Sequence, residues 1–260
     1  MHRSHDYALL VRRWRKVAVA AGLRLQRFAM AGKLPVYFLR TVTAADPRTI
    51  YLSAGIHGDE PAGPAALLAW AEKHSAQLRA WPFLLFPCLN PWGLLNNTRF
   101  DAQGCDLNRT FADQRPPSPV QELKRLIGTE RFALSLTLHE DYDATGFYLY
   151  EVMRHPPFWG EQLLRHARSL IAIETRPLID RRRARRGLVR RQFKPERFPA
   201  MPESIYLHRR NSYRTFTTET PSEFALETRI ATHVAMIEDC VRLAQTTPRC
   251  GKAWTSALTP

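Results

Sequence analysis

The chain has 260 residues, of which 45% are hydrophobic, so it can fold around a sizeable core. No apolar run is long enough to span a bilayer, and Arg12 to Lys16 interrupts the first apolar stretch, so we expect neither a membrane segment nor a secretory leader. The formal net charge of +14 makes an anionic partner a hypothesis to weigh. Four cysteines without paired spacing predict free thiols in a reducing compartment, and hence a cytoplasmic protein.

Along the chain, apolar runs typical of strands alternate with segments typical of helices. The runs that predict strands are 50–56, 83–89, 132–138, 147–151 and 215–221. The segments that predict helices are 61–77, 118–127, 158–173 and 222–244, the last with Ser222 as a candidate cap. This alternation predicts a single α/β domain with a mixed, mostly parallel central sheet and helices on both faces.

Metal-ligating side chains follow two of the predicted strands. His57 and Glu60 come directly after the run 50–56, and His139 ends the run 132–138. The carboxyl ends of parallel strands meet at one edge of a sheet, so these side chains could share one zinc ion and leave a position open for water. Taken singly, His-x-x-Glu is also common at solvated helix starts, and His139 could be a hydrogen-bonded core residue.

Further motifs lie between the two histidines. Asn90-Pro91-Trp92-Gly93 closes the run 83–89, and Arg99 then precedes Asp106-Leu107-Asn108-Arg109. With these motifs, in this order, the chain resembles the zinc carboxypeptidase superfamily. That superfamily contains metallocarboxypeptidases, murein peptide amidases, succinylglutamate desuccinylases and aspartoacylases. The resemblance divides the chain into an N-terminal extension (1–33), a zinc carboxypeptidase-like catalytic domain (34–245, with a basic insertion at about 178–212) and a C-terminal tail (246–260).

The resemblance implies a metal centre with one zinc ion per chain. His57, Glu60 and His139 match the zinc ligands of the superfamily. Asp106 matches the acidic residue that orients the first histidine, and such a hydrogen bond fixes the tautomer of a ligating imidazole.

The resemblance also implies catalytic and substrate-binding roles. Arg99 matches the arginine that polarises the scissile carbonyl, and Asn108 with Arg109 matches the pair that holds a terminal carboxylate. Glu219 ends a short predicted strand and matches the general base. Glu227 is its rival, but it lies in the predicted C-terminal helix and is interpreted as an ordinary helical carboxylate.

Two departures from the superfamily pattern bear on the substrate. After His139 the chain has Glu140-Asp141-Tyr142-Asp143, which fits a pocket for a cationic or amine-bearing substrate, a pair of supporting carboxylates, or a solvated turn. The mobile tyrosine of the digestive carboxypeptidases has no clear match, with Tyr206 and Tyr213 as candidates only.

A dense basic segment spans Arg181 to Arg186 and continues with Arg190, Arg191 and Lys194. Nucleic-acid binding is one hypothesis for it, but the segment lacks interleaved aromatic residues, and a flexible solvated loop is favoured. A third hypothesis is that the arginines border the active site and attract an anionic substrate.

The favoured function is a zinc hydrolase of the metallocarboxypeptidase or murein-peptide-amidase type, which acts on a peptide. The alternative is a deacylase of N-acyl amino acids. The 40 or so residues after Glu219 are too few for the C-terminal β-domain usual in that branch. A non-enzymatic basic binding protein on a hydrolase scaffold is the third hypothesis. The sequence leaves the oligomeric state open.

Overall fold

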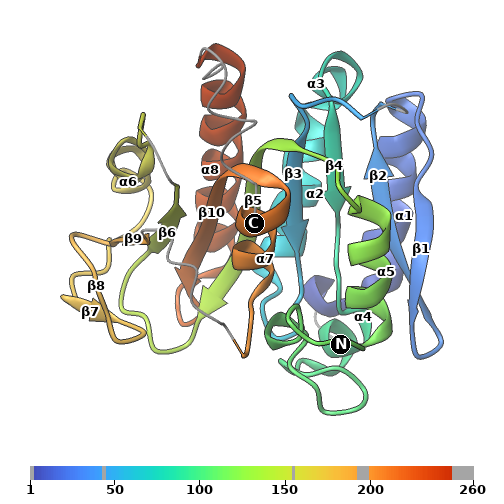
Figure 1. Ribbon diagram of the computed structural model, residues 1–260, viewed down its shortest axis with the longest axis horizontal. Helices are drawn as coiled ribbons and strands as arrows, with labels where there is room; N and C mark the ends of the chain where they lie inside the picture. The colour runs from blue at the N-terminus through green and yellow to red at the C-terminus, as the bar shows by residue number, and fades with distance from the viewer. Residues whose placement is uncertain (1–2, 43–44, 154–155, 192–198, 248–260) are drawn as a thin grey trace.

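The computed structural model describes residues 3–42, 45–153, 156–191 and 199–247, and they form an α/β domain around one large sheet (Figure 1). The sheet has eight strands in the order β1-β2-β4-β3-β5-β10-β6-β9. The four central strands β4, β3, β5 and β10 run parallel, whereas β1, β2 and β6 pair antiparallel with their inner neighbours. The predicted fold class is therefore confirmed.

The strands match the predicted apolar runs at the centre of the sheet and add edges that the sequence did not indicate. Their bounds are Gln26–Ala31 (β1), Leu34–Arg40 (β2), Ile50–Ala54 (β3), Phe83–Phe86 (β4), Phe132–Asp141 (β5), Tyr148–Val152 (β6), Leu188–Arg191 (β9) and Ser212–Pro221 (β10). A separate two-stranded hairpin consists of Leu178–Ile179 (β7) and Arg182–Arg183 (β8). All five residues of β3 are buried, as expected for a central parallel strand with both faces covered.

Helices cover both faces of the sheet, and the sheet separates the two main apolar clusters of the core. One apolar cluster joins the sheet to Tyr7–Ala20 (α1), Ala62–Lys73 (α2), Gly160–Ala167 (α6) and Leu226–Thr246 (α8). The other joins it to Ser118–Ile127 (α5) and Glu203–Arg210 (α7). In Figure 1, α5 and α7 lie in front of the sheet and α2 and α8 behind it. The short helical segments are Arg3–His5 (η1), Ser75–Ala80 (α3), Pro91–Asn96 (α4) and Leu107–Arg109 (η2).

Three of the predicted helices have different bounds in the structure, while 118–127 is confirmed as α5. The segment 61–77 is divided at His74, and the segment 158–173 is helical only from Gly160 to Ala167. The prediction that Ser222 caps the last helix was wrong, because its backbone N–H donates to Asp141 (3.1 Å) in continuation of β10. The helix begins four residues later, at Leu226.

The first 33 residues, predicted to be an extension, contribute α1 and β1 to this same sheet and core. Trp14 is fully buried, and the Tyr7 hydroxyl donates to the Pro35 carbonyl (2.6 Å). The outer limits of the catalytic domain stay a prediction. Most of the predicted tail, and Lys194 in the basic segment, lie outside the described residues. Within the described residues, no helix is long and apolar enough to cross a membrane.

Candidate active site

The turn that carries the first two candidate ligands packs tightly against the helical turn of α4, which follows β4. Gly58 lies between His57 and Glu60, and its N–H donates to the Thr98 carbonyl (3.1 Å). A Cβ at position 58 would lie 1.9 Å from the carbonyl carbon of Gly93. Only glycine fits here, so the close contact of these two turns fixes where His57 and Glu60 point.

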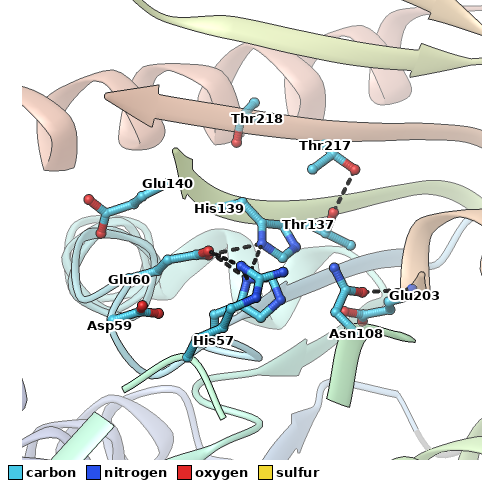
Figure 2. A network of polar contacts seen from close by, with 12 residues as sticks. His57, Asp59, Glu60, Asn108, Thr137, His139, Glu140, Glu203, Thr217 and Thr218 are labelled. Carbon is cyan, nitrogen blue, oxygen red and sulfur yellow. Dashed lines mark hydrogen bonds and ion pairs between the residues drawn. The ribbon is translucent and has the colours of Figure 1, made fainter. Parts of the chain in front are cut away.

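His57, Glu60 and His139 converge in one buried cluster (Figure 2). Each is 3% exposed. The Glu60 carboxylate contacts His57 Nδ1 at 2.5 Å and His139 Nδ1 at 2.9 Å, and the two Nδ1 atoms are 3.3 Å apart. The structure therefore brings together the three side chains that the sequence predicted as ligands.

The chemistry of this cluster fits a divalent metal ion. Two imidazole nitrogens and a carboxylate are the donor set that zinc prefers, and one potential ligand atom from each residue lies within 4.8 Å of the others. Burial alone would raise the pKa of Glu60, but the two imidazoles hold it well below its ordinary value. Burial lowers the pKa of His57, but Glu60 and Asp106 outweigh it, so that pKa is raised. The pocket thus stabilises positive charge beside the carboxylate.

Asp106 links the cluster to Arg99. Its carboxylate lies 3.3 Å from His57 Nε2 and accepts a hydrogen bond from Arg99 Nε (2.9 Å). Arg99 Nη1 in turn lies 3.8 Å from the Glu60 carboxylate. Burial would raise the pKa of Asp106, but contact with His57 and the charge of Arg99 lower it well below its ordinary value. Asp106 is therefore ionised and contacts the His57 ring; that it orients this ring stays a prediction.

Asn90, for which the sequence suggested no individual role, shapes the loop that carries Arg99. Its side-chain oxygen accepts from Gly93 N–H (2.9 Å), and its amide nitrogen donates to the Phe100 carbonyl (3.1 Å). Asn90 is completely buried. The Asn-Pro-x-Gly motif is thus a structural unit that holds this loop beside the cluster.

Asn108 and Arg109 lie on the same cavity as the cluster. The Asn108 side-chain oxygen accepts from the backbone N–H of Glu203 (2.9 Å), which leaves its amide N–H groups free to face the site (Figure 2). Arg109 is exposed at the cavity and contacts the Asn108 carbonyl through Nη1 (3.1 Å). Glu203 is buried behind Asn108, within the predicted basic insertion, where the sequence suggested no role for it, so the contact of its N–H with Asn108 was missed.

Glu219 is the residue of β10 that pairs in register with His139 on β5. It lines the cavity and is partly buried. Burial raises the pKa of Glu219 well above its ordinary value. His139 lowers this pKa, but the negative charges of Glu60, Asp141 and Asp180 raise it further. Its rival Glu227 is an exposed residue in the first turn of α8 and does not line this cavity.

The cavity has a volume of about 450 Å³, within the range of small-molecule sites. Part of its wall comes from Tyr148, Tyr150, Asp180 and Arg182, none of which the sequence singled out individually as site residues. Tyr148 and Tyr150 are two residues apart in a predicted strand, so their side chains are expected on the same face of the sheet. Neither candidate for the mobile tyrosine lines the cavity: Tyr206 packs against Phe111, and Tyr213 is buried.

The acidic residues after His139 have different environments. Glu140 is buried, forms an ion pair with Arg229 and accepts from the Ala62 N–H (2.6 Å), two residues beyond Glu60. Burial raises its pKa to about 7, against the pull of Arg229. Asp141 lines the cavity, whereas Asp143 is exposed.

In the basic segment 181–186, Arg181 lies in the turn of the β7–β8 hairpin and Arg182 and Arg183 form its second strand, and all arginines of the segment are exposed. Arg182 lines the cavity, so the segment does border the site. Whether it attracts an anionic substrate stays a prediction.

A family model for the succinylglutamate desuccinylase/aspartoacylase catalytic domain matches residues 46–179. No curated protein sequence matches the chain.

Solved structures share the fold. A candidate metallopeptidase from Shewanella baltica has a TM-score of 0.80 and 24% identity, over 93% of this chain and 93% of that one. A metallo-carboxypeptidase from Pseudomonas aeruginosa, in complex with (2-guanidinoethylmercapto)succinic acid, has a TM-score of 0.63 and 17% identity, over 92% of this chain and 68% of that one. Murein-tripeptide amidase MpaA from Escherichia coli O157 has a TM-score of 0.55 and 17% identity, over 86% of this chain and 93% of that one.

The matched range contains the His57-Glu60-His139 cluster together with Arg99 and Asp106, whereas Glu219 lies beyond it. It covers just over half of the chain. The protein therefore belongs to the succinylglutamate desuccinylase/aspartoacylase catalytic-domain family, a hydrolase branch of the zinc carboxypeptidase-like superfamily.

Proposed function

We propose that the protein is a zinc-dependent hydrolase that cleaves an amide bond next to a free carboxylate, as a metallocarboxypeptidase or a murein-peptide amidase does. One observation carries this proposal: a single cavity contains a candidate metal-ligand cluster, a cationic side chain beside it and a partly buried carboxylate on the strand next to that of His139. These three features are what metal-assisted hydrolysis requires.

His57, Glu60 and His139 would hold one zinc ion per chain. Zinc in such a site supplies Lewis-acid polarisation of a carbonyl and a water whose pKa is lowered to about 7. The Asp106 carboxylate, 3.3 Å from His57 Nε2, keeps the Nδ1 atom of that ring directed at the cluster.

The cationic part of the cavity would orient the substrate. Asn108 and Arg109 would bind the free carboxylate. The Asn108 amide N–H groups face the site, and the Arg109 guanidinium forms no ion pair with an acidic side chain among the described residues. Arg99 would stabilise the oxyanion that develops on the scissile carbonyl. It is held for this role by Asp106 and is one-third exposed, so a substrate can reach it.

Glu219 would take the proton from the attacking water and return it to the leaving amine. Its position next to His139 and its raised pKa both suit a general base, since proton transfer is most efficient when the pKa of the base approaches the working pH.

Deacylation of an N-acyl amino acid is the second candidate function. The observation in its favour is the family model, which is named for enzymes that act on succinylglutamate and on acylated aspartate. Both reactions hydrolyse an amide beside a carboxylate, so the same residues would serve either one.

The test is mass spectrometry of products from a panel of free-acid peptides, their C-terminal amides, γ-D-glutamyl peptides and N-acyl amino acids, with and without a chelator. We expect chelator-sensitive cleavage of free-acid substrates only. Cleavage of the amidated peptides at the same rate would contradict a carboxylate site at Asn108 and Arg109. A protein that holds no metal and cleaves nothing would instead favour the non-enzymatic binding hypothesis.

A further inference from the structure

The cavity wall built by β6 and the β7–β8 hairpin offers hydrogen-bond acceptors. The Tyr148 hydroxyl donates to Asp141 (2.8 Å), and the Tyr150 hydroxyl donates to Asp180 (2.5 Å). A tyrosine hydroxyl has a single proton, so both donors are already used. Besides the exposed Arg182 guanidinium, this part of the wall offers a ligand lone pairs on two phenol oxygens and two carboxylates, beside Glu219 on the neighbouring strand.

The hairpin places Asp180 at the cavity by an uncommon backbone conformation. Asp180 and Arg181 are the two residues between β7 and β8, and both have positive φ (49° and 59°). This is the pattern of a type I′ turn, in which non-glycine residues other than Asn and Asp are disfavoured. The preceding Ile179 is buried against Tyr148 and Val189, so the turn is anchored to the sheet.

The other part of the cavity has the opposite character. Arg99, the amide N–H groups of Asn108, and Arg109 are donors, and they suit the carbonyl and carboxylate of a substrate. A substrate that fills both parts needs acceptors at one end and donors at the other. An ammonium group provides three donors and a positive charge, which complements the acceptor wall.

Building on the proposed function, we propose that Asp180 is a specificity-determining residue that selects substrates with an ammonium group on the side chain of the residue next to the cleaved bond. The Tyr150 hydroxyl holds the Asp180 carboxylate, and Asp141 adds a second carboxylate to the same cavity wall. A carboxylate side chain in this position would face Asp180 and Glu219, so acidic residues are disfavoured there.

Two arginines lie near this wall, and among the described residues neither forms an ion pair with Asp180. Arg176 lies 3.7 Å from Asp141 but is tied more closely to Glu174 (3.0 Å). Arg182 lines the cavity from an exposed position, and within the described ranges it forms no ion pair with Asp180. Asp180 is thus the carboxylate on the hairpin that is available to a cationic ligand.

The experiment compares free-acid peptides that are identical except for a terminal lysine, Nε-acetyl-lysine or glutamate. With zinc-loaded wild-type protein we expect kcat/KM for lysine to exceed that for acetyl-lysine by about 10- to 100-fold, mainly through KM, as one charged hydrogen bond would give. Asp180→Asn should bring this ratio close to 1, chiefly through a higher KM for the lysine peptide. Asparagine tolerates the left-handed conformation, so the turn should persist.

Asp143→Asn is the matched control, because it removes the same charge from an exposed position outside the cavity lining. It should keep the lysine preference. A wild-type preference for glutamate, or a lysine preference that survives Asp180→Asn, would overturn the proposal while the hydrolase function stands.

Calorimetry separates this subsite from the proposed function. L-lysine should bind zinc-loaded wild-type protein more tightly than Nε-acetyl-L-lysine, and Asp180→Asn should abolish the difference, whether or not any peptide is cleaved. Equal binding of the two amino acids to the wild-type protein would refute the ammonium subsite.

Discussion

Replacing Asp106 by asparagine tests whether the metal cluster depends on its supporting carboxylate. Asparagine has the same shape, and its amide oxygen can still accept from the Asn108 N–H, which Asp106 Oδ1 now does at 3.0 Å. What is lost is the negative charge 3.3 Å from His57 Nε2. A full positive charge on the His57 ring would be attracted by roughly 5 kcal/mol at that distance and an effective dielectric constant of about 20; this is an upper bound, because a zinc-bound imidazole is neutral.

Two features reduce that bound. Asp106 shares its charge with Arg99, and its side chain is 18% exposed, so water screens part of the interaction. Loss of such supporting carboxylates elsewhere weakens metal binding by about 10- to 100-fold, or about 1.4–2.7 kcal/mol, and we expect the same here.

The assay is zinc affinity by competition with a chromogenic chelator, with circular dichroism of the metal-free proteins to show that the fold is kept. Asp113→Asn is the control, since it makes the same change at an exposed position of the same loop region. If Asp106→Asn bound zinc within twofold of the wild-type affinity, the carboxylate would not support His57.

Three further predictions concern catalysis, the turn and pH. Glu219→Gln should keep its zinc, measured by elemental mass spectrometry, but lose about 100- to 10,000-fold in kcat; retained turnover would remove Glu219 from the mechanism. Gly58→Ala should weaken zinc binding in the same chelator assay, because its Cβ would lie 1.9 Å from the Gly93 backbone; wild-type affinity would show that the turns can separate. Burial would raise the pKa of Glu174, but the N–H groups of Arg176 and Thr145 lower it to about 2 from 4.5. This carboxylate therefore stabilises the fold above pH 4.5, and the stabilisation is lost as pH falls towards 2. In Glu174→Gln, the free energy of unfolding, measured with urea at a series of pH values, should fall less steeply between pH 4.5 and 2.

The sequence predicted the metal cluster because its geometry follows from strand ends. His57 and His139 terminate long apolar runs, and parallel strands bring such ends to one edge whatever the separation along the chain. Glu219 was predicted from the resemblance, and the structure shows that it pairs in register with His139.

Other parts of the site and fold lack such a signal. Asp180 lies between two strands of two residues each, inside an arginine-rich segment without apolar periodicity, so local pattern could not predict a hairpin. In α1, Leu10, Trp14 and Val17 have helical spacing and are buried, but the resemblance begins only at residue 34, so this segment was predicted to be an extension. In each case tertiary packing, rather than local propensity, decides the structure.

The topology also separates reaction chemistry from substrate choice. The ligand cluster and Glu219 come from or directly follow the parallel strands β3, β5 and β10, whose positions are fixed by the buried core on both faces of the sheet. Tyr148 stands opposite Glu219 because β6 runs antiparallel to β10, and the strand and hairpin beyond it face the same cavity from the edge of the sheet. Substitutions at that edge can change the charge of the cavity wall without moving a metal ligand. We therefore expect changes at Asp180 to act on KM and substrate preference, and changes at Asp106 or Gly58 to act on metal binding, so the two sets of variants should have independent effects.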